Sequence, residues 1–380
     1  MKWRSAVSTR IQGAEALAEV VARLNGPAPD LVLLFLTHHH QKSAEELLRK
    51  IQSAYPGARI FGCAGGGVVG GGREVEEGPG LSLTLAQLPD VEIESWHLGE
   101  NTDLSAWEGP IPEQDPAILV LADPTTLPVD ALLRSLDRRW PNCPKVGGLT
   151  SGGQAPGENL LFLDGVVHRD GAVVLSLWGD IQLRSVVAQG ARPLTEPMTV
   201  TRGHYTRIYE LDGKPVVQVL EDLFGRLSQE ERELFRGAPL VGLSNVEVPR
   251  RGDWLVRNLT GLSRKEGTVM VSSLVREGQK IAFHLRDRET AQADLAEMLA
   301  RGRQQLRGNP AEATLLFSCL GRGSGFFGEL HYESREIQRI IGGAGPAGFF
   351  CGGEIGPIHG QSWLHGYTSS VGIVSTRGWS

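Results

Sequence analysis

The sequence is poor in cysteine and has no long apolar run, and each shortage excludes a class of protein. Its 380 residues include only four cysteines, too few for a disulfide framework, and no CxxC pair is present for zinc or redox chemistry. The longest apolar runs, 31–36 and 117–122, are far too short to cross a bilayer, and the first residues lack the apolar core of a signal peptide. We therefore expect a soluble protein of the reduced cytoplasm.

A strong charge of one sign is also missing. The 38 basic and 44 acidic residues are interspersed and give a formal net charge of −6, which excludes the basic field needed to hold nucleic acid or an anionic membrane. Hydrophobic residues make up 41% of the chain and charged residues 22%, as in ordinary globular proteins. Since one hydrophobic core stops growing at about 250–300 residues, the length predicts two domains.

The order strand, helix, strand, glycine loop occurs three times. In the first copy an apolar run at 31–36 precedes a segment with Leu47, Leu48 and Ile51 at helical spacing, then 59–67 ends in glycines. A second copy covers 117–122, 129–139 and 145–153, and a third covers 314–319, 334–341 and 348–356. Each copy continues into one more candidate strand, at 81–88, 172–178 and 368–374. The pattern predicts internal repeats at about 31–88 and 117–178, in which Gly62 corresponds to Gly148 and Cys63 to Cys351.

A turn at 212–215 separates two related portions of the chain. We expect α/β domains at 1–201 and 212–380, each built from the repeated unit, with helices packed on mixed parallel and antiparallel sheets. The runs 253–259, 268–274 and 280–285 alternate or are β-branched between glycine turns, which predicts antiparallel strands that join the C-terminal sheet.

Three short motifs carry a resemblance to a known family. They are Leu211-Asp-Gly-Lys-Pro215, Phe317-Ser-Cys-Leu-Gly-Arg322 and Gly348-Phe-Phe-Cys-Gly-Gly-Glu-Ile-Gly-Pro357. In this order the chain resembles the FIST family, with a FIST N region to about residue 201 and a FIST C region from about 212. The resemblance implies a sensory role with a small ligand such as an amino acid, no established catalytic residues, and output through a separate signalling protein. One departure is Gly366-Tyr367-Thr368, where the family often has an asparagine.

The loops after the repeated strands are the candidate ligand site. If the strands are parallel, these loops meet at one sheet edge, the usual ligand position in α/β folds. The candidate ligand-binding residues at this edge are Cys63, Gly65, Gly66, Thr150, Ser151, Cys319, Arg322, Cys351 and Glu354. Arg322 could hold a carboxylate and Glu354 an ammonium, which together suit an amino acid, or the two could pair with each other.

Other readings of these residues stay open. Cys319 or Cys351 could serve a thiol-dependent enzyme, although cysteine is also a common buried apolar residue and no motif supplies a base. Adjacent histidines at 38–40 point in different directions and disfavour one metal ion, and the glycines at 65–72 lack the ending of a phosphate-binding loop. The charged run 73–77 suggests a solvated surface. We expect a ligand-binding sensor with no cofactor or metal, and a partner-binding module without a ligand is a further alternative.

Overall fold

The computed structural model describes residues 1–112 and 114–377, which form two compact units. The larger unit combines Met1–Val187 with Ala296–Ser380, and the smaller unit is Ala188–Leu295. The predicted fold class, α/β with mixed sheets and packed helices, is confirmed. The division in space differs from the division of the sequence near residue 212, because strands near the C-terminus pair with strands of the N-terminal half.

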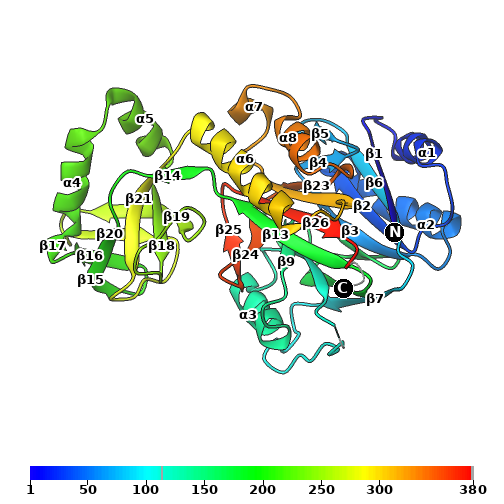
Figure 1. Ribbon diagram of the computed structural model, residues 1–380, viewed down its shortest axis with the longest axis horizontal. Coiled ribbons are helices and arrows are strands. Elements are labelled where there is room, and N and C mark those ends of the chain that lie inside the picture. Colours follow the sequence, from blue (N-terminus) through cyan, green and yellow to red (C-terminus); the bar gives the residue numbers. More distant parts are fainter. Residues whose placement is uncertain (113, 378–380) are drawn as a thin grey trace. The chain divides into compact units, whose positions relative to one another are not determined.

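Three sheets of six strands build the larger unit, and each has one parallel pair (Figure 1). The first sheet has the order β1 (Lys2–Ser8), β6 (Leu81–Gln87), β2 (Leu31–Thr37), β3 (Arg59–Gly65), β10 (Leu161–Leu163), β11 (Val166–His168). The second has the order β7 (Val91–Leu98), β12 (Ala172–Gly179), β8 (Ala117–Ala122), β9 (Lys145–Leu149), β24 (Glu354–Ile358), β25 (Gln361–His365). The third has the order β13 (Gln182–Ala188), β26 (Ser369–Ser375), β22 (Ala313–Cys319), β23 (Ala344–Cys351), β4 (Gly67–Gly70), β5 (Arg73–Val75).

The last two strands of each sheet are a hairpin that comes from another segment of the chain. The hairpin β4–β5 follows β3 in sequence but pairs with β23 in the third sheet. In the same way β10–β11 leaves the second segment to pair with β3, and β24–β25 leaves the third segment to pair with β9. Each of the three segments thus adds a hairpin to the sheet of another segment. The N-terminal and C-terminal portions of the chain therefore share sheets. A common origin of the segments stays a prediction.

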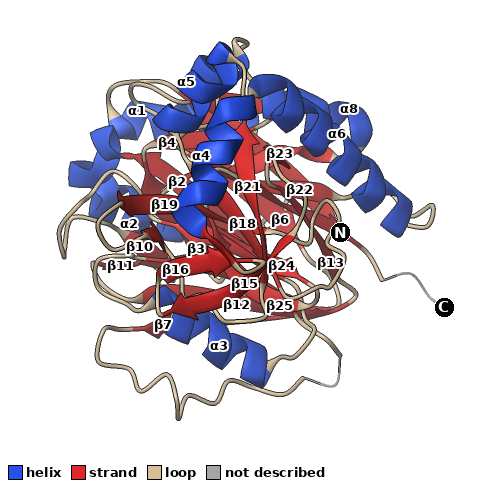
Figure 2. Cartoon of the chain, turned by 90° about the vertical axis from the view of Figure 1, so that its left-hand side faces the viewer, coloured by secondary structure: helices blue, strands red, loops and turns tan. Residues whose placement is uncertain are grey.

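The inner faces of the three sheets share one apolar core, and helices cover their outer faces. Phe35, Leu119 and Phe317 come from different sheets and belong to the same buried cluster. Helices α1 (Gly13–Arg23) and α2 (Ala44–Ala54), the latter preceded by the 3-10 turn η1 (His38–Ser43), pack on the first sheet through apolar residues such as Leu47. Helix α3 (Val129–Arg139) packs on the second sheet (Figure 2), and α7 (Ser324–Phe327) and α8 (Tyr332–Ile340) lie between β22 and β23 in sequence.

A glycine in each parallel pair allows the two strands to approach closely. A Cβ atom on Gly62, Gly147 or Gly348 would lie 1.8 Å, 1.8 Å or 1.9 Å from the carbonyl oxygen of the partner strand. These three glycines are therefore equivalent. The expected correspondence of Gly62 with Gly148 is wrong by one residue, because the second segment is one residue shorter between its parallel strands. Cys63 follows its glycine directly while Cys351 lies three positions after Gly348, so their expected equivalence is also wrong.

Eight strands and two whole helices form the smaller unit. Six strands pair in a closed ring, in the order β21 (Lys280–Arg286), β15 (Met198–His204), β16 (Arg207–Leu211), β20 (Thr268–Val271), β19 (Leu255–Ser263), β18 (Leu240–Ser244) and back to β21. Short strands β14 (Ala191–Pro193) and β17 (Lys214–Pro215) pair with β21 and β16. The strands predicted at 253–285 are antiparallel as expected. They do not join the C-terminal sheet, because their partners are β15, β16 and β18 in the ring.

Local sequence explains the helices of the smaller unit. Pro215 precedes α4 (Val216–Arg226), where its fixed φ suits a helix start, and Leu220 and Leu223 are buried. Helix α5 (Gln229–Gly237) begins with a capping box in which Ser228 and Glu231 each bond the other's backbone N–H. The chain returns to the larger unit within α6 (Arg288–Gln305).

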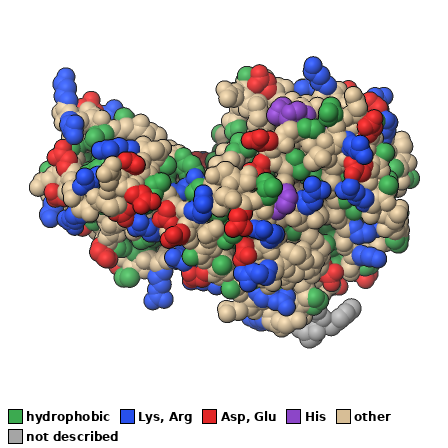
Figure 3. Space-filling view, turned by 90° about the horizontal axis from the view of Figure 1, so that it is seen from above, with side chains coloured by type: hydrophobic (Ala, Val, Ile, Leu, Met, Phe, Trp, Pro, Cys, Tyr) green, Lys and Arg blue, Asp and Glu red, His purple; other side chains and the backbone are tan. Residues whose placement is uncertain are grey.

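The distribution of surface charge and the length of the helices both agree with what the amino-acid composition indicates. Basic and acidic side chains are interspersed on the face of the larger unit seen in Figure 3. Within residues 1–112 and 114–377, the structure contains no helix with the length and apolar character that a membrane span requires.

Candidate functional site

The ends of parallel strands from all three sheets meet at one edge of the larger unit. The Ser151 hydroxyl, just after β9, accepts a 2.8 Å hydrogen bond from the N–H of Gly66, which follows β3. The same hydroxyl donates a 2.6 Å bond to the carbonyl oxygen of Phe350 in β23. One buried serine thus joins strand ends whose residues are far apart in sequence, and it fixes the edge where the candidate residues lie.

The small predicted residues pack this junction. A Cβ atom on Gly65 would lie 2.7 Å from the Phe349 ring, and one on Gly66 would lie 2.5 Å from the Leu320 side chain. Thr150 is buried, and its hydroxyl donates to the carbonyl oxygen of Ala122. These residues therefore shape the edge through close packing and backbone contacts.

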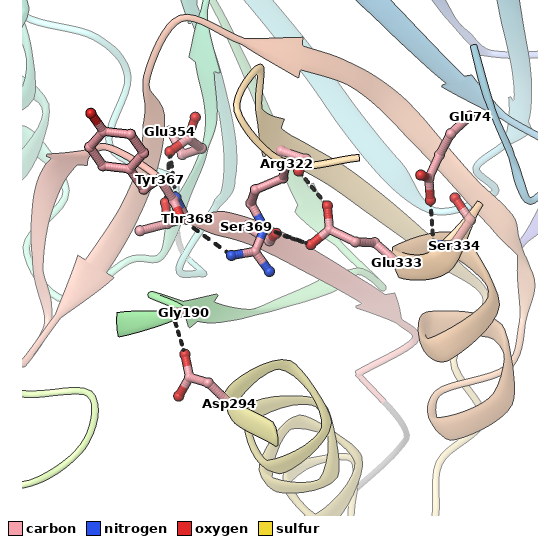
Figure 4. Close-up of polar contacts among 11 residues, drawn as sticks. Glu74, Gly190, Asp294, Arg322, Glu333, Ser334, Glu354, Tyr367, Thr368 and Ser369 are labelled. Atoms are coloured by element: carbon pink, nitrogen blue, oxygen red, sulfur yellow. Dashed lines mark hydrogen bonds and ion pairs between the residues drawn. The ribbon is translucent and has the colours of Figure 1, made fainter. Parts of the chain in front are cut away.

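Arg322 lies buried in the loop after β22. Its Nε donates a 2.9 Å hydrogen bond to Glu333 Oε1 in an ion pair whose two side chains are both 0% exposed. Its Nη1 donates to the carbonyl oxygen of Tyr367 at 3.2 Å (Figure 4). The guanidinium lies over the Phe327 ring, 5.1 Å from its centroid. Nη2 is buried, and it has no hydrogen-bond partner among the described residues. The arginine thus keeps one donor without a partner although its side chain is fully buried.

Glu354, at the start of β24, is the second buried charge of this edge. One carboxylate oxygen accepts bonds from the Thr368 N–H at 3.1 Å and the Thr368 hydroxyl at 2.8 Å. The other oxygen, Oε1, is buried with no hydrogen-bond partner in the described part of the chain. Burial raises the pKa of Glu354 to about 8, while the Thr368 bonds and the nearby Arg322 act in the opposite direction. The pairing of Arg322 with Glu354 that the sequence left open is not formed: Glu354 is a neighbour of Arg322, whose ion pair is with Glu333.

Two glutamates of this cluster, Glu333 and Glu74, were not among the residues predicted from the sequence. Glu333 accepts hydrogen bonds from the Ser318 and Ser369 hydroxyls besides its ion pair with Arg322. Glu74 lies in the run expected to be solvated, yet it is buried, and it accepts a 2.7 Å bond from the Ser334 N–H. Burial and the neighbouring Glu333 raise the pKa of Glu74 to about 7.

The solvated-surface prediction for 73–77 is therefore wrong at Glu74. The hairpin β4–β5 carries this residue into the third sheet, where it reaches α8. Glu76 of the same run also has a structural contact, since its carboxylate accepts bonds from the N–H and hydroxyl of Ser324. Glu74 and Val75 are both buried after exposed Arg73, so strand alternation gives no sequence signal for Glu74.

The cysteines differ in their surroundings. Cys63 and Cys351 are fully buried in the core shared by the three sheets, and burial raises the pKa of both thiols well above the ordinary range. Cys319 is half-buried at the end of β22, and its nearby side chain acts to lower the pKa of Glu354. The thiolate form is thus disfavoured at Cys351, which weakens its role in a thiol enzyme, while Cys319 stays part of the polar edge.

The histidines at 38–40 lie in the 3-10 turn after β2. The rings of His38 and His39 pack at a centroid distance of 4.0 Å, and His40 is buried. Outside the undescribed residues 113 and 378–380, no group of three His, Cys, Asp or Glu side chains has the arrangement of a metal site.

The fold and this edge define a protein of three exchanged sheets with a buried polar cluster where their parallel strands end. The FIST N domain matches residues 30–214 and the FIST C domain matches 217–357, so the chain belongs to the FIST family. FIST domains are sensory domains of signal transduction. The resemblance inferred from the three motifs is confirmed.

Relatives extend over nearly the whole chain. Rv0628c of Mycobacterium tuberculosis, an uncharacterized protein, is 33% identical over 377 residues that cover 97% of each chain. The uncharacterized protein Mb0898c of Mycobacterium bovis is 31% identical over 370 residues, or 96% of this chain and 95% of that one. A solved cyanuric acid hydrolase aligns over 99% of this chain and 100% of its own at 8% identity and a TM-score of 0.31.

Proposed function

We propose that this protein senses a small zwitterionic ligand, an amino acid or a related metabolite, at the strand-end edge of the larger unit. One observation carries the proposal: Arg322 Nη2 and Glu354 Oε1 are both buried and both without a partner in the described chain. An unpaired buried polar group costs about 1–3 kcal/mol, so a ligand that pairs both groups gains that energy on binding. The ligand carboxylate accepts from Arg322, and its ammonium donates to Glu354.

The electrostatics of the edge favour such a ligand. The charge of Arg322 is already offset by Glu333 at 2.9 Å, so a carboxylate alone adds a second negative charge next to it. Glu354 has its pKa raised to about 8 by burial and is neutral when the site is empty. An ammonium group ionises it and supplies the balancing charge. A zwitterion therefore fits better than a simple anion or a simple amine.

Signal output is proposed to pass to a separate signalling protein that recognises the bound state. Family membership supports this, because FIST domains match nearly the whole chain. Leu320, beside Gly66, belongs to the same loop as Arg322 and follows Cys319 at the end of β22. A ligand at Arg322 and Glu354 thus acts on a loop whose Leu320 side chain is exposed, where a partner can contact it.

A thermal-shift screen of the purified protein against the common amino acids tests the proposal. A ligand at about 100 times its Kd adds about 2.7 kcal/mol of stability and raises the melting temperature visibly. The rise should be lost in Glu354→Gln, which keeps the shape of the protonated side chain, and kept in Glu329→Gln, a control with 55% side-chain exposure. No stabilising amino acid, or a rise of the same size in Glu354→Gln, contradicts the proposal.

A further inference from the structure

The smaller unit has a cleft of about 890 Å³ that the proposed function does not use. Its walls come from the segment around β14, from α4 and from residues 249–254. The family motif at 211–215 lies beside it, since Leu211, Asp212 and Lys214 line the cleft. The motif turn is fixed in place because Asp212 Oδ1 accepts a 2.8 Å bond from the N–H of Thr199.

Apolar side chains form the inner lining of the cleft. Leu211, Leu223, Leu227 and Trp254 all line it and are each less than a tenth exposed. Leu223 and Leu227 follow each other at helical spacing from the end of α4, so they present one apolar face. The volume is in the range of about 300–1,000 Å³ typical of ligand sites, and it exceeds what one amino acid fills. An occupant must therefore be larger than the ligand proposed for the larger unit.

The charges at the cleft are partly committed to the protein itself. Arg192 pairs with Glu231 at 2.9 Å and with Asp287 at 3.1 Å, and the bond that Arg192 donates to Glu231 is the main reason why the pKa of Arg192 is raised. Arg192 thus links β14, the strand before β15, to α5, and its guanidinium is not available to a ligand. Asp212 is likewise used by its turn.

Side chains of both signs remain uncommitted. Among residues 188–295, all of which the structure describes, three basic and two acidic side chains line the cleft and form no ion pair: Lys214, Arg226, Arg250, Glu196 and Asp222. A polyanion such as a nucleotide meets acidic groups here, and a simple amine meets basic groups. A molecule that is apolar in its body and carries one charge of each sign at its ends satisfies both.

We propose that this cleft binds short peptides with free termini. Such a peptide has an ammonium at one end, a carboxylate at the other and side chains between them that pack on Leu223, Leu227 and Trp254. Asp222 receives the ammonium, and Arg226 at the end of α4 receives the carboxylate. The inference goes beyond the proposed function, because it uses residues of the smaller unit alone.

Titration of the intact protein with trileucine tests the peptide site. Free trileucine should bind, while trileucine with an acetylated N-terminus and an amidated C-terminus should bind at least about tenfold more weakly, because blocking removes both charged ends. Calorimetry measures both affinities. Trp254 is the one tryptophan between 188 and 295, so ¹⁹F spectra of 5-fluorotryptophan protein report the site, with Trp254→Phe to assign its signal.

Matched variants locate the binding. Asp222→Asn and Arg226→Gln should each weaken trileucine by about tenfold. The controls are Glu221→Gln, next to Asp222 on α4 but outside the cleft lining, and Arg264→Gln, whose side chain is 76% exposed, and both should leave affinity unchanged.

Several results overturn the proposal. They are equal binding of free and blocked peptide, no binding of either, an unmoved Trp254 signal, or equal loss in variants and controls. Glu354→Gln must leave trileucine binding intact, so failure of the amino-acid site and failure of the peptide site are distinguishable.

Discussion

Replacing Glu333 by alanine removes the ion-pair partner of buried Arg322 and should lower the free energy of unfolding. Glu333 Oε1 lies 2.9 Å from Arg322 Nε, and neither side chain is exposed. At an effective dielectric constant of about 20 the attraction at that distance is about 6 kcal/mol before desolvation is counted. The variant also leaves the hydroxyls of Ser318 and Ser369 without their acceptor. Stripping one partner from a buried pair costs about 3–5 kcal/mol, and we expect a loss of that size in the free energy of unfolding.

Urea unfolding followed by tryptophan fluorescence measures the loss. Glu329→Ala is the matched control, because its ion pair with Arg335 joins two side chains that are each 55% exposed and should be worth less than about 1 kcal/mol. The double variant R322M/E333L replaces the pair with apolar groups and should recover part of the loss, since no charge is left unpaired although the Ser318 and Ser369 hydroxyls still lack their acceptor. A Glu333→Ala variant as stable as Glu329→Ala would contradict a stabilising role for the buried ion pair.

Three further outcomes follow from the structure. Gly348→Ala places a Cβ atom 1.9 Å from the Leu316 carbonyl oxygen, so it should unfold the larger unit or destabilise it by more than about 3 kcal/mol. In the control Gly225→Ala no atom lies within 4 Å of the new Cβ, so urea unfolding should show no change or a gain of up to about 1 kcal/mol. The pKa of Glu354 is about 8 without ligand, and the ligand ammonium ionises it, so binding releases a proton. The affinity measured by calorimetry should therefore rise between pH 6 and 8 and level off above pH 8. An affinity that does not change with pH would exclude this role of Glu354. Iodoacetamide should label half-buried Cys319 before the three buried cysteines, and faster labelling at any other cysteine by mass spectrometry would contradict the environments described.

The secondary structure was predictable where local pattern decides it. Leu47, Leu48 and Ile51 at helical spacing predicted α2, and all three are buried against the first sheet. Apolar runs predicted the parallel strands β2 and β8 for the same reason, since strands buried on both faces need no alternation.

Pairing between distant segments was not predictable from local pattern. The exchange of β4–β5, β10–β11 and β24–β25 depends on which sheet edge each hairpin meets, and short strands carry little information about that choice. The ring of the smaller unit was missed for the same reason, because antiparallel strands can close on themselves or extend a sheet with the same alternation.

Burial of charge was the least predictable feature of the site. Loop position and glycine neighbours singled out Arg322 and Glu354, and both belong to the polar cluster. Glu74 and Glu333 have no such signal, because the burial of Glu74 depends on Ser334, 260 residues away, and that of Glu333 on strand ends brought together by the fold. A carboxylate in a charged run predicts solvent exposure unless its distant partners are known.

The central claim is that Arg322 and Glu354 together bind one zwitterion. Calorimetric titration of the protein with the amino acid identified in the screen, with the amine that lacks its carboxylate, and with the acid that lacks its amino group tests this most directly. The amino acid should bind, and each analogue should bind at least about tenfold more weakly, since each leaves one buried group unpaired. Equal affinity for the amino acid and either analogue would contradict it.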